Sequence, residues 1–70
     1  MDMKGRWLDS LRLEKRRIDD EIKKLEQVVD VMPDRVPTTA QVTLIRLQVA
    51  VLRSLSSVYD ERILEVRTWK

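Results

Sequence analysis

The side chains that most often carry catalysis are missing from this chain of 70 residues, which has no histidine and no cysteine. Nucleophilic catalysis usually pairs one of these groups with a base, and soft or imidazole metal sites need them as ligands. Carboxylates could still act in pairs, and Glu14 with Glu21, or Glu61 with Glu65, share helix faces. These glutamates lie among Lys and Arg on faces expected to be solvated. The sequence therefore predicts a protein that is not an enzyme and that holds no metal and no cofactor.

Arginines offer a different chemistry in the second half of the chain. The stretch between residues 35 and 59 contains no carboxylate, and Arg46 and Arg53 lie seven residues apart, on one helix face. Arginines repeated by oligomerisation are a usual way to bind the phosphates of nucleic acid. The alternative is that both arginines pair with Asp19 and Glu26 on the flank of the first helix.

Two tryptophans, Trp7 and Trp69, stand near opposite ends of the chain. A hairpin would bring them to the same end of the molecule. They would either close the core there or, with Leu13 and Leu64 adding apolar surface, form a patch that binds another protein.

Two prolines, Pro33 and Pro37, divide the chain into halves of nearly equal length. Proline ends a helix and restricts the residue before it, and a short linker makes successive helices antiparallel. The expected fold is one all-α domain over residues 1–70, an antiparallel two-helix hairpin with helices at about 3–32 and 38–69 and a loop at 33–37. Thr38 followed by Gln41 forms a capping-box pattern at the start of the second helix.

Each half carries an apolar heptad seam that is interrupted at one polar position, Lys15 in the first and Ser56 in the second. The seams consist of Leu8, Leu11, Ile18, Ile22, Leu25, Val29 and Met32, and of Val42, Ile45, Val49, Leu52, Tyr59, Ile63 and Val66.

A polar layer is expected where these two interruptions meet, because residues at the same level of the hairpin have numbers that sum to about 70. Lys15 then lies beside Ser56, which we expect to exchange hydrogen bonds with Tyr59 and so fix the register. The functional alternative is a pocket at a subunit interface for a phosphate-bearing ligand, with Arg12, Lys15 and Arg62 as donors and Ser56 and Tyr59 beside them.

A second apolar row on the second helix consists of Leu44, Val51 and Val58, beside Leu55. Together with the seam it widens the apolar arc to about half of the helix circumference. Because the first helix cannot cover that arc, the sequence predicts assembly with further copies into a dimeric four-helix bundle or a higher helical oligomer.

Charge and hydropathy limit the classes of partner that the chain can bind. The 14 basic and 12 acidic side chains leave a net charge of +2, which gives little long-range attraction for nucleic acid or anionic lipid. No apolar run approaches the roughly 18 residues of a membrane span, and the first residues do not lead into a signal-peptide core. We therefore expect a cytoplasmic protein that does not bind membranes.

These observations favour a small regulatory or adaptor protein, for example from a virus, a plasmid or a bacterial accessory region, that oligomerises and binds or inhibits a larger protein. One alternative is a helical dimer that binds nucleic acid through Arg46 and Arg53. The other is a protein that sequesters an anionic small molecule, such as a nucleotide, at a subunit interface.

Overall fold

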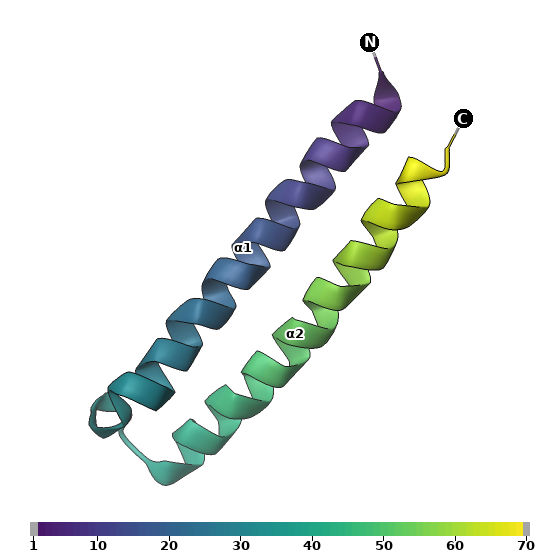
Figure 1. Ribbon diagram of the computed structural model, residues 1–70. Coiled ribbons are helices and arrows are strands. Elements are labelled where there is room, and N and C mark those ends of the chain that lie inside the picture. Colours follow the sequence, from purple (N-terminus) through teal and green to yellow (C-terminus); the bar gives the residue numbers. More distant parts are fainter. Residues whose placement is uncertain (1, 70) are drawn as a thin grey trace.

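Two antiparallel helices joined by a short turn make up the fold (Figure 1). The computed structural model describes residues 2–69. Helix α1 spans Met3–Val31, a 3-10 turn η1 spans Pro33–Arg35, and α2 spans Thr39–Arg67. This part of the chain contains no strand. The all-helical hairpin that the two prolines predict is therefore confirmed.

Side chains cap the start of both helices. The carboxylate of Asp2 accepts a hydrogen bond from the backbone N–H of Lys4 at 3.1 Å, and the hydroxyl of Thr38 accepts one from the N–H of Gln41 at 3.1 Å. Each bond satisfies a donor that has no partner within its helix. Between residues 2 and 69 the Gln41 side chain makes no hydrogen bond back to Thr38, so the capping box is only half formed.

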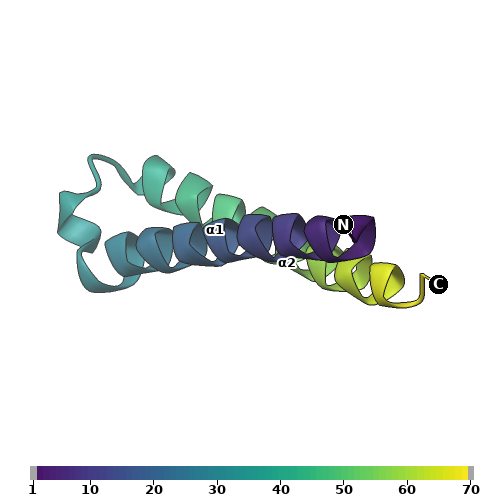
Figure 2. The ribbon, with the colours of Figure 1, turned by 90° about the horizontal axis from the view of Figure 1, so that it is seen from above.

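The apolar seams meet where the heptads predict. The fully buried apolar side chains are Leu11, Ile22, Val29, Val49 and Val66, and all five belong to the expected seams. The other seam positions are half-buried. Figure 2 shows α2 crossing α1 at a shallow angle, as expected when ridges of side chains pack into grooves. The hairpin is 51 Å long but only 17 by 13 Å across, so it has one line of core and no second layer.

The two ends of the chain lie together at the open end of the hairpin (Figure 1). There the ammonium of Lys4 donates hydrogen bonds to the carbonyl oxygens of Arg67 at 3.1 Å and Trp69 at 3.0 Å. These carbonyls lie at the C-terminal end of α2, where unpaired oxygens and the helix dipole both favour a cation. Lys4 thus ties the start of α1 to the end of α2.

Candidate functional site

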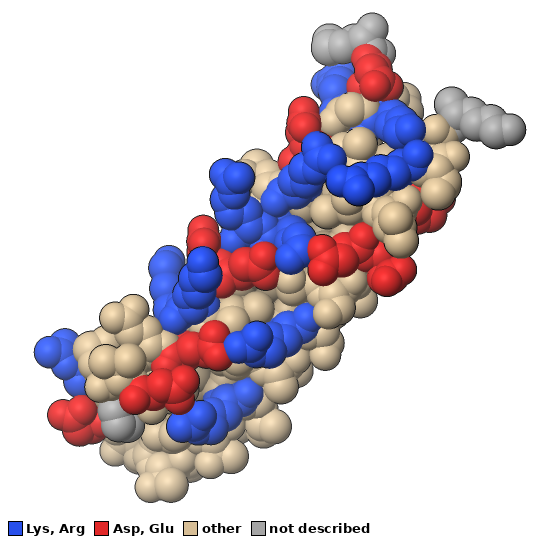
Figure 3. Space-filling model, in the orientation of Figure 1, with Lys and Arg blue, Asp and Glu red and all other residues tan. Residues whose placement is uncertain are grey.

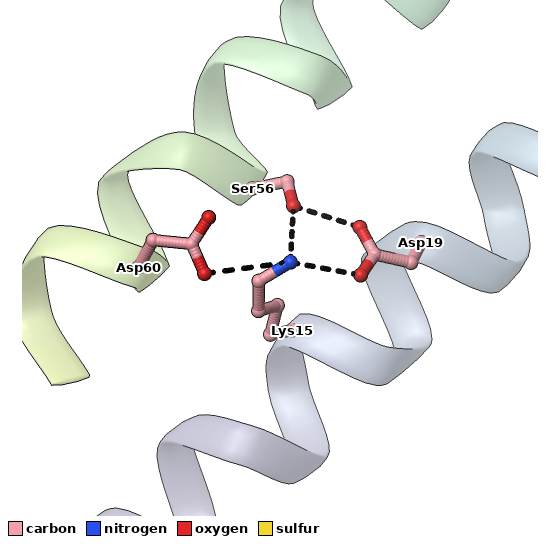
Figure 4. Close-up of polar contacts among 4 residues, drawn as sticks. All are labelled: Lys15, Asp19, Ser56 and Asp60. Atoms are coloured by element: carbon pink, nitrogen blue, oxygen red, sulfur yellow. Dashed lines mark hydrogen bonds and ion pairs between the residues drawn. The ribbon is translucent and has the colours of Figure 1, made fainter.

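A polar layer crosses the apolar seam at Lys15 and Ser56, as predicted (Figure 4). The Lys15 ammonium donates hydrogen bonds to the Ser56 hydroxyl at 3.1 Å and to the Asp19 carboxylate at 3.0 Å. The Ser56 hydroxyl donates in turn to the other oxygen of Asp19 at 2.7 Å. The Asp60 carboxylate completes the layer, 3.5 Å from the same ammonium. Lys15 and Asp19 come from α1, and Ser56 and Asp60 come from α2.

The charges in this layer stabilise each other. Hydrogen bonds from Ser56 and Lys15 lower the pKa of Asp19 below its ordinary value of 3.8. The hydrogen bond to Asp19 and the field of Asp60 raise the pKa of Lys15 above 10.5. Both shifts favour the ionised forms, so at neutral pH Lys15 is an ammonium and Asp19 a carboxylate.

The expected hydrogen bond between Ser56 and Tyr59 is not formed, and that prediction was wrong. Ser56 gives its single proton to Asp19, which is the stronger acceptor because it is charged. Asp19 and Asp60 were both missing from the predicted layer. Their signal was present, because each lies four residues after a seam interruption, Asp19 after Lys15 and Asp60 after Ser56.

The predicted basic row on α2 is engaged inside the hairpin. Arg46 pairs with Asp30 at 3.2 Å, and Arg53 pairs with Glu26. The alternative interpretation, pairing with acidic side chains of the first helix, thus describes both arginines, although Asp30 takes the place expected for Asp19. Figure 3 shows acidic and basic side chains meeting across the junction of the two helices on this face. Charge that is already neutralised in this way attracts phosphates weakly.

Arg62 lies over two aromatic rings near the open end of the hairpin. Its guanidinium carbon is 5.0 Å from the centre of the Tyr59 ring and 5.9 Å from that of Trp7, within the range of cation–π attraction. Trp69 donates its indole N–H to Glu65 at 2.9 Å. Both tryptophans stay partly exposed, Trp7 by 44% and Trp69 by 39%, so they do not close the core.

Arg12 lines a shallow hollow of about 310 Å³ on α1, together with Asp9, Leu13 and Arg16. Lys15 and Arg62 do not line it; Lys15 binds carboxylates and Arg62 covers aromatic rings. The residues proposed for an anionic ligand are thus held in different arrangements. Over residues 2–69 there is also no cluster of three acidic side chains that could hold a metal ion.

A row of large apolar side chains on α2 is left uncovered by α1. It consists of Leu44, Leu47, Val51, Leu55 and Val58, with 55%, 58%, 67%, 41% and 51% of their surfaces exposed. We call this set the outer row. Four of its members were expected from the sequence. Leu47 was missed, although its spacing of three residues from Leu44 and four from Val51 places it on the same face.

No family model, no curated protein and no solved structure matches this chain. Neither helix, within residues 2–69, is long and apolar enough to cross a membrane.

The outer row lies on the opposite side of α2 from the ion-paired side chains. Leu44, Val51 and Val58 each precede by two residues a side chain that pairs with α1, namely Arg46, Arg53 and Asp60. Two residues correspond to about 200° around an α-helix. The hairpin therefore has a face that is bridged by charge and another, along α2, that is apolar and open.

Proposed function

We propose that this protein is a self-associating interaction module, a small regulatory or adaptor protein that pairs with another copy through α2. The observation that carries the proposal is the outer row, which stays exposed after α1 has packed against α2. Scattered exposed leucines are ordinary on a protein surface, but a continuous apolar patch marks an interaction site.

Burial of the outer row would stabilise an assembly substantially. Complete burial of one Val or Leu side chain contributes about 1.5–3 kcal/mol relative to full exposure. Each of the five side chains still exposes 41% or more of its surface. The hairpin buries only a single line of core side chains, which gives a lone chain little stability. Burial of the outer row against a second copy would therefore add substantially to it.

The charge distribution supports a protein partner more than a nucleic acid. The α2 arginines best placed for phosphates, Arg46 and Arg53, are held by carboxylates of α1. To bind a phosphate backbone they would first have to give up these partners.

The open end of the hairpin is the surface we assign to the larger partner. Trp7 and Trp69 are both exposed there, and tryptophan and arginine dominate the energetics of protein interfaces. Three arginines in the first half of α1, Arg6, Arg12 and Arg16, make no ion pair within residues 2–69. An acidic partner segment with an apolar anchor would fit this combination of exposed indole and unpaired guanidinium groups.

Sedimentation equilibrium tests the self-association. We expect the unmodified chain to sediment as a multiple of its mass of 8.3 kDa and the variant Val51→Glu to sediment as a single chain. Val51 is 67% exposed, so a glutamate there is compatible with the hairpin, but it would place a charge in the middle of the proposed interface.

Leu13→Glu is the matched control, because Leu13 is also exposed but lies on α1, outside the outer row. This variant should sediment as the unmodified chain does. If the unmodified chain has single-chain mass at every concentration at which it stays soluble, the proposal is wrong.

A further inference from the structure

The outer row has the same spacing when it is read in either direction. Its five members are separated by three, four, four and three residues, with Val51 in the middle. The next residues in line, Ala40 and Arg62, lie four residues beyond each end and keep the symmetry. A row of this kind can be matched to a copy of itself that runs in the opposite direction.

The row also runs nearly parallel to the helix axis. From Ala40 to Arg62 it follows an eleven-residue repeat, which is about 3.67 residues per turn and close to the 3.6 of an undistorted helix. Around a straight helix this repeat drifts by about 20° per eleven residues, a smaller drift per residue than that of a heptad seam, which drifts by about 20° per seven residues in the opposite sense. The outer row therefore runs nearly along the axis of α2 for about 21 Å from Leu44 to Val58, or about 33 Å from Ala40 to Arg62, and a second helix can contact it over that length.

We infer that a second copy of this chain docks with its α2 antiparallel to the first, with the two Val51 side chains meeting at a two-fold axis. The inference rests on the proposed self-association and adds its direction and register. Leu44 then lies opposite Val58 of the second copy, and Leu47 opposite Leu55 of the second copy. Every contact occurs twice, as in any isologous interface.

The ends of the row favour this direction over the parallel one. In the antiparallel register Arg62 lies opposite Ala40 of the second copy, where the small side chain leaves room for the arginine and brings no second charge. A parallel pair in the same register would place the two Arg62 guanidinium groups opposite each other, where their like charges would repel. It would also leave the two alanines facing each other across a gap.

This arrangement has a consequence for the shape of the assembly. Both chain ends lie at one end of each hairpin (Figure 1). Antiparallel docking therefore sends the two open ends, each with its Trp7 and Trp69, to opposite poles of the pair. Such an assembly would bind two copies of its partner at once, which suits an adaptor.

Disulfide trapping can test the register cleanly because the chain has no cysteine of its own. We expect Val51→Cys to form a disulfide-linked dimer in a mild redox buffer. A mixture of Leu44→Cys and Val58→Cys chains should link one chain of each kind.

Leu44→Cys alone should not link, because the two copies of residue 44 would be 14 residues apart along the helix, about 21 Å. A disulfide requires α-carbons within about 7 Å of each other. If Leu44→Cys alone links efficiently, the docking is parallel and the inference is overturned while self-association stands.

Two further outcomes would also overturn the inference. If the unmodified chain is an oligomer by sedimentation but neither Val51→Cys nor the mixture forms a disulfide-linked dimer, the chains associate through a different surface. If the unmodified chain is a single-chain species, the proposed function fails together with the register.

Discussion

At the scale of single residues, the layer of Lys15, Asp19, Ser56 and Asp60 gives the apolar seam its register. Every polar group of the layer has a partner, and no buried side-chain nitrogen or oxygen within residues 2–69 lacks one. A shift of either helix by one turn would leave Lys15 among apolar side chains and Ser56 without its acceptor. The layer thus costs some apolar burial and in return excludes other registers.

Ser56→Ala should raise the pKa of Asp19 back towards 3.8, because the hydrogen bond from Ser56 is the largest cause of the lowering. The free energy of unfolding should fall by about 1 kcal/mol, as is typical when one hydrogen bond is lost. An NMR titration of the Asp19 carboxyl carbon measures the first effect and urea unfolding the second. Ser57→Ala is the control, since Ser57 is exposed and lies one residue away. Equal titration curves for the two variants would contradict the assignment.

The same shift determines how acid acts on the fold. A carboxyl whose pKa is lower in the folded state stabilises the protein above the pKa of the unfolded chain. That contribution is fully present above about pH 3.8 and is lost as the pH falls through the lowered value. In Ser56→Ala the loss should begin at the same pH, because the unfolded chain sets that limit, but it should be smaller and complete at a higher pH, nearer to 3.8.

At the scale of the helices, the boundaries follow from local chemistry. Thr38→Ala should lower the free energy of unfolding by about 1 kcal/mol, because the first turn of α2 would lose its side-chain acceptor. Thr39→Ala is a close control, since the Thr39 side chain makes no hydrogen bond within the described residues and alanine suits the first helical position. Urea unfolding of both variants under the same conditions gives the comparison. A loss of equal size in both would show that the Thr38 hydroxyl makes no specific contribution as a cap.

The helices and their seam could be predicted because heptad spacing and two prolines are properties of the sequence alone. Lys15 and Ser56 were also visible, as interruptions of a regular pattern. The ion-pair partners of the charged residues could not be predicted in the same way, because Asp19, for example, has several basic neighbours at helical spacing. Helical spacing alone favours Lys23, because an acid four residues before a base is the better order, whereas the structure pairs Asp19 with Lys15. That choice depends on Ser56, which reaches Asp19 only once the hairpin has formed.

The same limit applies to the surface of α2. The positions of Arg46 and Arg53 on one face could be predicted, but their neutralisation depends on the crossing that brings Asp30 and Glu26 beside them. A long side chain can reach several acids at similar distance from its own helix position. Which of these acids it pairs with is therefore decided by how the two helices pack.

At the scale of the whole molecule, the hairpin is long and thin. Its core is one line of side chains, and apolar side chains of comparable size are exposed along the outer row. Small domains of this kind usually gain stability from disulfides, metals or association. The chain has no cysteine for a disulfide, and residues 2–69 contain no cluster of side chains that could hold a metal ion. Of the three sources of stability, association through the outer row remains.

The melting temperature should therefore depend on protein concentration. When unfolding separates two chains, each tenfold increase in concentration favours the folded pair by about 1.4 kcal/mol. Circular dichroism melting curves over a wide range of concentrations should shift upward for the unmodified chain and for Leu13→Glu. Val51→Glu should melt at a lower temperature that does not change with dilution, because its hairpin unfolds alone. A melting temperature of the unmodified chain that is independent of concentration would show that one seam is enough to hold the hairpin, and the exposed row of α2 would then need a different explanation.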